Sequence, residues 1–385
     1  MQDPGRLEIT TKIGCQCRCD YCPQQLLISQ YFKKNNPNPD TLMSLDTFKK
    51  CINKLPKGTR IDFSGMAEPW LNPKCTEMVL YAHEKGFPIA VYSTFVGMTY
   101  VDFEMLKEIP YEEFVLHIPD DKSRSHINVT SDYIKLLEDA LEYKQQTGKR
   151  LVTGISCHAG VHPAIKKAVP EDSKLITEIH NRAGNLENEF LESKINHGEI
   201  ICINCGTNLH HNVLLPDGTV LLCCMDYGMK HILGNLLYDE YNEIYKSEES
   251  QKVRYGLKND KNDILCRNCV NARNVNEMYD EYIFYKNWVT DLEKQESQRI
   301  TEISEYKNWI DKLEKRSQEN KNEIQKINEQ YNQRVNENKE YKTWVSKLEN
   351  QNQELRDEIQ RINTAYEQRV KELHEYMDWV EKLQS

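Results

Sequence analysis

The sequence lacks several features that would place it in common functional classes. It has no run of eighteen or more apolar residues, so no membrane-spanning helix is predicted. Its start, MQDPGRLEIT, has no basic stretch followed by an apolar one, so no secretory signal is predicted. With 50 basic and 60 acidic residues, the net charge is −10 and no basic patch stands out, which disfavours recognition of nucleic acid. These absences predict a cytoplasmic protein without a membrane span.

Cysteine, by contrast, is abundant. The 385 residues include thirteen cysteines, and most fall into two groups, one at residues 15–22 and one at residues 202–269. In a reducing compartment, clustered cysteines bind metal more often than they form disulfides. The two groups therefore predict two metal sites.

The chain divides into three parts that differ in composition and in the pattern of apolar residues. Residues 1–195 alternate strand-like runs such as LEITTKI, RIDFSG and IAVYST with helical stretches, which predicts an α/β fold with a parallel sheet. Residues 196–275 contain six cysteines and a hairpin-like LLPDGTVLL, which predicts a small α+β domain. Residues 276–385 contain neither proline nor glycine, which predicts an uninterrupted helical region.

The last part is a repeat. Residues 305–339 realign with residues 340–374, and one heptad register extends from Met278 to Leu383. β-Branched residues at position a with leucine at many d positions favour a parallel two-stranded coiled coil, and hence a homodimer. The tryptophans of this region occupy g positions beside the seam: Trp288, Trp309, Trp344 and Trp379. A single solvated helix is the alternative.

The first cysteine group has the spacing C-x3-C-x2-C at Cys15, Cys19 and Cys22. Three thiolates can hold three irons of a [4Fe-4S] cluster and leave the fourth iron open to bind and reduce a small ligand. A structural zinc site would need a fourth ligand, and Cys17 is the alternative that supplies it.

The stretch from Cys15 to Pro23, with Tyr21 before the last cysteine, resembles the radical SAM superfamily. The loop SGMAEP after RIDF is similar to the family's S-adenosylmethionine-binding loop. The resemblance covers about 195 residues and implies a partial (βα)6 TIM-like barrel. It also implies that a [4Fe-4S] cluster held by the three cysteines cleaves S-adenosylmethionine reductively to a 5′-deoxyadenosyl radical. The electron would come from a donor such as flavodoxin or ferredoxin.

The same resemblance implies further contacts with S-adenosylmethionine. It assigns them to residues of SGMAEP and of two later strand ends: Gly65, Glu68, Pro69, Ser93, Thr94, Gly154 and Ile155. Glycines, hydroxyl residues and small apolar residues are also common where strands simply end.

The second cysteine group resembles a shortened SPASM, or Twitch, domain. The match rests on Cys205, Cys223 and the pair Cys266-x2-Cys269, and it implies one auxiliary [4Fe-4S] cluster held by these four thiols. Cys202 competes with Cys205 for the first position. A zinc ribbon formed by Cys202, Cys205, Cys266 and Cys269 is the alternative, and it leaves Cys223 without a role.

The substrate is less well indicated. Polar candidates near predicted strand ends are Tyr92, His117, Asp120, His158 and Arg182, of which Arg182 is the predicted catalytic residue. Cys157 and Cys224 are candidate hydrogen-atom donors, although a lone cysteine is more often a small buried apolar residue.

Two functional classes fit the sequence best. The first is an enzyme that oxidises or epimerises a small polar molecule, such as a sugar or aminocyclitol, in carbohydrate modification or glycan biosynthesis. The second is a maturase acting on a peptide or protein, which the short stretch before Cys15 disfavours. A scaffold with a non-catalytic core is a third reading, which the complete cysteine loop and SGMAEP loop disfavour.

Overall fold

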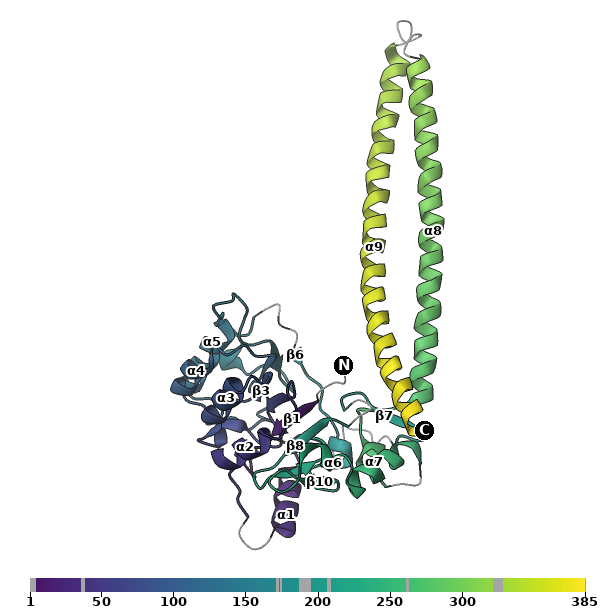
Figure 1. Cartoon of the computed structure of the whole chain (residues 1–385). Coiled ribbons are helices and arrows are strands. Elements are labelled where there is room, and N and C mark those ends of the chain that lie inside the picture. The colour runs from purple at the N-terminus through teal and green to yellow at the C-terminus, as the bar shows by residue number, and fades with distance from the viewer. Residues whose placement is uncertain are drawn as a thin grey trace. The chain divides into compact units, whose positions relative to one another are not determined.

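The computed structural model describes residues 5–35, 39–170, 173, 175–186, 195–205, 209–260, 263–320 and 328–384 (Figure 1). By their internal contacts these residues form two compact units, residues 1–275 and residues 276–385. Among the described helices, none is long and apolar enough to cross a membrane.

The first unit is built on one nine-stranded sheet with the order β10-β9-β8-β1-β2-β3-β4-β5-β6. Its strands are β1 (Arg6–Ile9), β2 (Arg60–Phe63), β3 (Ile89–Ser93), β4 (Glu113–His117), β5 (Gly154–Ser156), β6 (Leu175–Ile176), β8 (His211–Leu214), β9 (Thr219–Leu221) and β10 (Ile232–Asn235). Strands β1 to β6 are all parallel and neighbour one another in sequence order. This arrangement confirms the predicted α/β fold and brings the carboxyl ends of six strands to the same edge.

Helices connect the parallel strands and cover the sheet. They are α1 (Gln24–Lys34), α2 (Leu45–Ile52), α3 (Cys75–Glu84), α4 (Tyr100–Leu106) and α5 (Ser131–Glu142). Local sequence fixes several of their starts: Thr99 and Asp102 form a capping box at α4, and Ser44 caps α2 by accepting from the N–H of Thr47. The apolar faces of these helices are buried, which keeps the loops after the strands in fixed positions.

The second cysteine group lies in a segment that is joined to the sheet. Strand β8 pairs in parallel with β1, and β9 and β10 extend the sheet in antiparallel fashion. A separate two-stranded sheet pairs β7 (Ile200–Cys202) with β11 (Ala272–Asn274). The remaining short elements of this segment are α6 (Tyr241–Ile244), α7 (Glu248–Lys258) and the 3-10 turn η4 (Leu265–Asn268). The boundary at residue 196 stays a prediction, because this segment shares hydrogen-bonded strands with residues 1–195.

The predicted coiled coil and its parallel partner stay predictions. The described part of the second unit contains two helices, α8 (Val275–Asn320) and α9 (Asn328–Gln384) (Figure 1). Tyr306 contacts Trp344 and Trp309 contacts Tyr341, with ring centroids 4.6 and 4.8 Å apart. From Tyr306 to Trp309 the chain of α8 moves forward, while the contacted residue in α9 moves back from Trp344 to Tyr341. The two helices are therefore antiparallel within one chain.

The antiparallel pairing could not be predicted from the heptads. A heptad pattern specifies an apolar seam but neither the identity nor the direction of the helix that covers it. A partner helix in the same chain is available at an entropic cost of chain closure that grows only slowly with the length of chain between the paired residues. Trp309 and Trp344 each pack across the seam against a tyrosine of the other helix, in edge-to-face geometry. The predicted homodimer stays a prediction.

The division between the units leads to a prediction about truncation. A chain that ends at Asn276 is expected to remain folded and monomeric, because the internal contacts of residues 1–275 do not depend on the two long helices. Multi-angle light scattering of the truncated and full-length proteins measures this. A dimer of the truncated chain would show instead that the first unit associates by itself.

Candidate functional site

The SGMAEP loop follows β2 and is held tightly against the neighbouring strand. Gly65 has φ +60°, and a Cβ at this position would lie 2.8 Å from the Cα of Thr10. The N–H of Met66 donates to the Thr10 hydroxyl over 3.0 Å. Only glycine suits this positive φ and this close approach, so the loop has one defined path from the sheet edge.

Glu68 links this loop to the end of β3. Its buried carboxylate accepts hydrogen bonds from the Ser93 hydroxyl at 2.7 Å, and from the backbone N–H and hydroxyl of Thr94 at 2.6 and 2.7 Å. Burial raises the pKa of Glu68, against the lowering effect of these donors. Glu68, Ser93 and Thr94, which the sequence places in one binding site, therefore lie together.

The cysteine loop lies beside the same junction. Cys17 is buried, and its Sγ lies 3.8 Å from the hydroxyl of Thr94. The thiols of Cys15, Cys17 and Cys19 are in contact: the hydrogen bond with Cys17 raises the pKa of Cys15. The hydrogen bond with Cys15 lowers the pKa of Cys17. The hydrogen bond with Cys19 and burial raise this pKa by more, so the pKa of Cys17 is raised to about 12.

Cys22 makes its contacts on the side of the second cysteine group. Its Sγ lies 3.5 Å from the hydroxyl of Tyr227 and 3.6 Å from the side-chain nitrogen of Gln24. All four cysteines of the loop are free thiols, and Cys15, Cys19 and Cys22 are half-buried. The loop therefore offers soft sulfur ligands at a protected position near the sheet edge, which is the donor set that an iron–sulfur cluster requires.

The second cysteine group converges on one cavity. Its lining includes six cysteines from three different segments: Cys202, Cys205, Cys223, Cys224, Cys266 and Cys269. The N–H of Cys205 donates to the sulfur of Cys202 over 3.1 Å. The thiol of Cys205 also hydrogen-bonds the sulfur of Cys202. Together with the backbone donors, this hydrogen bond lowers the pKa of Cys202 to about 7. Cys202 and Cys205 thus both face the cavity, and the geometry does not separate them.

The pKa values in this cavity show how the sulfurs affect one another. The neighbouring thiols of Cys202 and Cys223 raise the pKa of Cys205, and burial raises that of Cys266. As these side chains stand, no three or more Cys, His, Asp or Glu residues of the described chain have metal-ligand spacing. Bound iron would deprotonate and draw in such thiols, so the donor set fits a cluster.

The remaining predicted residues differ in their surroundings. The Cys157 thiol contacts the carbonyl oxygen of Ala159 at 3.3 Å, and Asp120 accepts hydrogen bonds from the turn that follows it, including the N–H and hydroxyl of Ser125 at 3.0 Å each. Both side chains have structural roles here. Gly154 and Ile155 lie in β5 beside β4, where a Cβ on Gly154 would lie 3.2 Å from a methyl group of Val115.

Two histidines follow neighbouring strands. His117 ends β4, and burial followed by the charge of His158 lowers its pKa to about 4. The rings of His117 and His158 are 6.3 Å apart, and His158 also contacts Tyr21 with centroids at 4.4 Å. These two neutral imidazoles thus lie beside the cysteine loop, as the sequence predicts for residues at the open end of the sheet.

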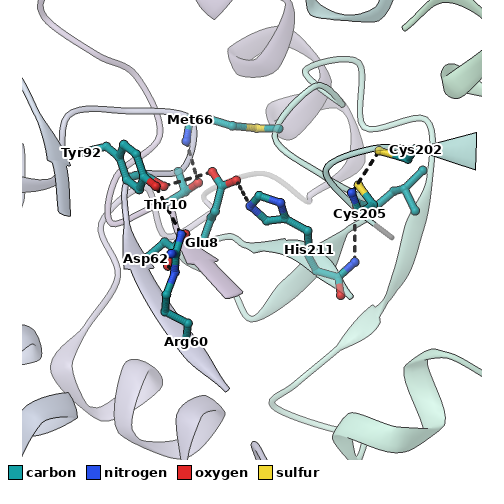
Figure 2. A network of polar contacts seen from close by, with 12 residues as sticks. Glu8, Thr10, Arg60, Asp62, Met66, Tyr92, Cys202, Cys205 and His211 are labelled. Carbon is teal, nitrogen blue, oxygen red and sulfur yellow. Dashed lines mark hydrogen bonds and ion pairs between the residues drawn. The ribbon is translucent and has the colours of Figure 1, made fainter. Parts of the chain in front are cut away.

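Tyr92 has a different position from the one predicted. It belongs to a polar network inside the sheet, in which Arg60 binds Asp62 with its Nε and Nη2 at 2.6 and 2.7 Å (Figure 2). The Tyr92 hydroxyl hydrogen-bonds Arg60 and Glu113, which begin β2 and β4. Its ring therefore reaches toward the start of the strands, away from the edge that carries the cysteine loop.

The buried pair Glu8 and His211 is a part of the site that the sequence did not reveal. Glu8 in β1 accepts from His211 Nε2 at 2.7 Å and from the Ser64 hydroxyl at 3.0 Å (Figure 2). It also hydrogen-bonds the thiol of Cys224. Glu8 thus connects the SGMAEP loop with the second cysteine group. The only signal in the sequence was an acidic residue inside the apolar run LEITTKI.

Comparison with known proteins gives one family match, over the second cysteine group. Residues 205–270 match the SPASM family model, described as an iron–sulfur cluster-binding domain. A cofactor-modifying protein of tungsten-containing aldehyde ferredoxin oxidoreductase from Pyrococcus furiosus is 31% identical over 106 residues. That match covers 27% of this chain and 26% of the relative, so the chain spans about a quarter of its length.

Solved structures match the chain in part. BtrN in complex with AdoMet and 2-DOIA is 17% identical with a TM-score of 0.47, over 69% of this chain and 93% of that one. Streptococcus suis SuiB bound to S-adenosylmethionine is 13% identical with a TM-score of 0.42, over 65% of this chain and 68% of that one. The SPASM match over residues 205–270 indicates an iron–sulfur cluster-binding domain, and the cysteine loop and the SGMAEP loop resemble those of radical SAM enzymes.

Proposed function

We propose that the protein is a radical SAM oxidoreductase that acts on a small polar substrate of the sugar or aminocyclitol class. The observation that carries this proposal is the junction at the sheet edge, where Glu68 binds Ser93 and Thr94 beside the cysteine loop. The thirteen free cysteines suit a reducing compartment, for which we propose the cytoplasm, with a flavodoxin or ferredoxin as electron donor.

In this proposal each residue has a role at the junction. Cys15, Cys19 and Cys22 hold the first [4Fe-4S] cluster, and the backbone of the SGMAEP loop binds S-adenosylmethionine. Glu68 keeps the loop in place through its bonds to the end of β3. When bound at these residues, the cluster and S-adenosylmethionine would supply radical chemistry able to remove a hydrogen atom from the substrate. The protein orients the substrate carbon and keeps water away from it.

The second cysteine group supplies an electron acceptor. We assign Cys205, Cys223, Cys266 and Cys269 as ligands of an auxiliary [4Fe-4S] cluster, with Cys202 as the competing ligand in the same cavity. Such an acceptor supports a net two-electron oxidation of a hydroxyl-bearing carbon. In such an oxidation the substrate would lose a carbon-bound hydrogen atom, a hydroxyl proton to a base, and one electron, which a cluster held by these cysteines would be able to accept. The substrate then becomes a carbonyl compound.

Epimerisation is the alternative reaction, and it needs a thiol that donates a hydrogen atom. Cys224 is the better placed candidate, because it lines the auxiliary cavity and hydrogen-bonds Glu8, whereas the thiol of Cys157 is directed to the carbonyl of Ala159. A thiol hydrogen exchanges with solvent. In D2O, epimerisation would therefore place deuterium on the reacting carbon, whereas oxidation would place none there.

The reaction in D2O with a sugar nucleotide or an aminocyclitol separates the two routes. We expect a carbonyl product without deuterium at the reacting carbon, measured by mass spectrometry, and we expect Cys224→Ala to keep this activity. Cys157→Ala is the matched control. Deuterium at the reacting carbon that disappears in Cys224→Ala would establish epimerisation instead.

A further inference from the structure

The turn that carries Arg182 is held in an unfavourable backbone conformation. Arg182 has φ +48° and Ala183 φ +55°, and Gly184 follows at φ +80°. Glycine adopts such angles readily, but for other residues this conformation is sparsely populated and costly. Two such residues in succession persist only where the surroundings hold them, and strain of this kind is common at binding sites.

Two asparagines attach this turn to the second cysteine group. The Asn181 side chain accepts from the N–H of Ala183 at 3.0 Å and donates to the carbonyl oxygen of Asn268 at 2.9 Å. The Asn185 side chain donates to the carbonyl oxygen of Met225, also at 2.9 Å. Asn268 lies between Cys266 and Cys269, and Met225 follows Cys224. The position of Arg182 is therefore fixed relative to the auxiliary cavity.

The Arg182 side chain lies between the two cysteine groups. The central carbon of its guanidinium is 5.8 Å from the centre of the Tyr227 ring, and the hydroxyl of that tyrosine lies 3.5 Å from the sulfur of Cys22. The Arg182 Nε is buried and has no hydrogen-bond partner among the described residues. Leaving a buried charged donor without a partner costs more free energy than leaving a neutral one without a partner.

Histidines, thiols, Tyr227 and Glu8 surround this charge. Burial is the main cause that lowers the pKa values of His117, His158 and His180, and the positive charge of Arg182 adds to it at each. Burial lowers the pKa of Arg182, but Tyr227, the thiols of Cys224 and Cys22, and Glu8 together raise it by more. The Glu8 carboxylate is already bound by His211 and Ser64. Arg182 thus keeps a buried donor without a partner among the described residues.

We infer that Arg182 binds an anionic oxygen group of the substrate, such as a phosphate or carboxylate, beside the auxiliary site. A guanidinium forms paired hydrogen bonds with such groups, and both its shape and its charge match them. This inference rests on the proposed function and narrows its substrate class. It selects an acidic sugar derivative, such as a sugar phosphate or nucleotide sugar, over an aminocyclitol, whose ammonium groups the same charge would repel.

Binding of inorganic phosphate to the full-length, anaerobically reconstituted protein tests the inference. Isothermal titration at constant ionic strength is expected to show one saturable site in the wild type. Arg182→Gln should weaken that site about 10-fold or more, and Arg182→Lys should weaken it less, because lysine keeps the charge but loses the paired geometry. Arg150→Gln, which changes an exposed arginine, is the matched control and should bind as the wild type does.

The same titration with sugars addresses the substrate class. Glucose 1-phosphate is expected to bind at least 10-fold more tightly than glucosamine, and this preference should disappear in Arg182→Gln. The inference is overturned if phosphate binds the wild type no more tightly than Arg182→Gln, or if glucosamine binds as well as glucose 1-phosphate. Iron content and circular dichroism of Arg182→Gln show whether that variant has kept its fold.

A separate measurement distinguishes this inference from the proposed function. Reduction with dithionite in the absence of substrate should yield 5′-deoxyadenosine from S-adenosylmethionine in the wild type and in the control Arg150→Gln, whose exposed side chain lies outside the proposed site. If the wild type yields none, the proposed function is wrong, while the phosphate titration still decides the role of Arg182.

Discussion

Simultaneous replacement of Cys15, Cys19 and Cys22 by alanine is expected to halve the iron content of the reconstituted protein and to abolish 5′-deoxyadenosine formation. Two [4Fe-4S] clusters correspond to about eight irons per chain, and loss of the first should leave about four. The reason is that the two cysteine groups occupy separate places: the second group lines its own cavity, to which the first loop contributes no residue. Colorimetric iron analysis and chromatography of the cleavage product measure the two effects.

Cys51→Ala provides the matched control for this experiment. Cys51 is a fully buried cysteine in α2, outside both groups, so its removal should leave the iron content and the cleavage unchanged. One zinc per chain in place of iron in the wild type would contradict the assignment of the clusters. Retention of about eight irons in the triple variant would show that other thiols, such as Cys17, replace the three.

Glu8→Gln is expected to destabilise the first unit by about 3–5 kcal/mol, the usual effect of removing one partner of a buried ion pair. The side chains of Glu8 and His211 are only 8% and 15% exposed, so the remaining partner cannot be solvated by water. For a unit of this size, the loss corresponds to a decrease in melting temperature on the order of 10 °C. Thermal unfolding followed by circular dichroism under anaerobic conditions measures it.

The stabilising effect of this pair should depend on pH in a defined way. Burial raises the pKa of Glu8, but the hydrogen bond and charge of His211 outweigh this and lower it. Burial lowers the pKa of His211, but Glu8 raises it by more. The contribution of Glu8 is therefore lost as the pH falls below its ordinary pKa of about 4.3, and that of His211 is lost as the pH rises above about 6.5. The difference in melting temperature between the wild type and Glu8→Gln should be greatest between these values.

An exposed pair serves as the control for the buried one. Asp46 and Lys50 form an ion pair on α2 with side chains 74% and 63% exposed, so Asp46→Asn should change the stability by less than about 1 kcal/mol. If Glu8→Gln were as mild as Asp46→Asn, the buried network would not hold β1 and β8 together. The double variant Glu8→Gln/His211→Gln should recover part of the loss, because neither uncompensated charge is then buried.

The sequence by itself predicted the local features of the site. The spacing of Cys15, Cys19 and Cys22, the SGMAEP loop after a strand, and the alternation of strands and helices are all patterns over a few residues. They indicated the parallel sheet and the two cysteine groups. Glu68 and Thr94 also came from such patterns, because both follow the carboxyl ends of parallel strands and these ends meet at one edge of the sheet.

Contacts between distant segments were decided only by the tertiary structure. The bonds of Glu8 to His211 and Ser64, and the attachment of the Arg182 turn to Asn268 and Met225, join residues that no local pattern relates. In the helical region the heptads specified an apolar seam, but α8 and α9 cover that seam within one chain. Periodicity specifies which face of an element is buried, whereas its partner depends on chain closure and on packing over the whole molecule.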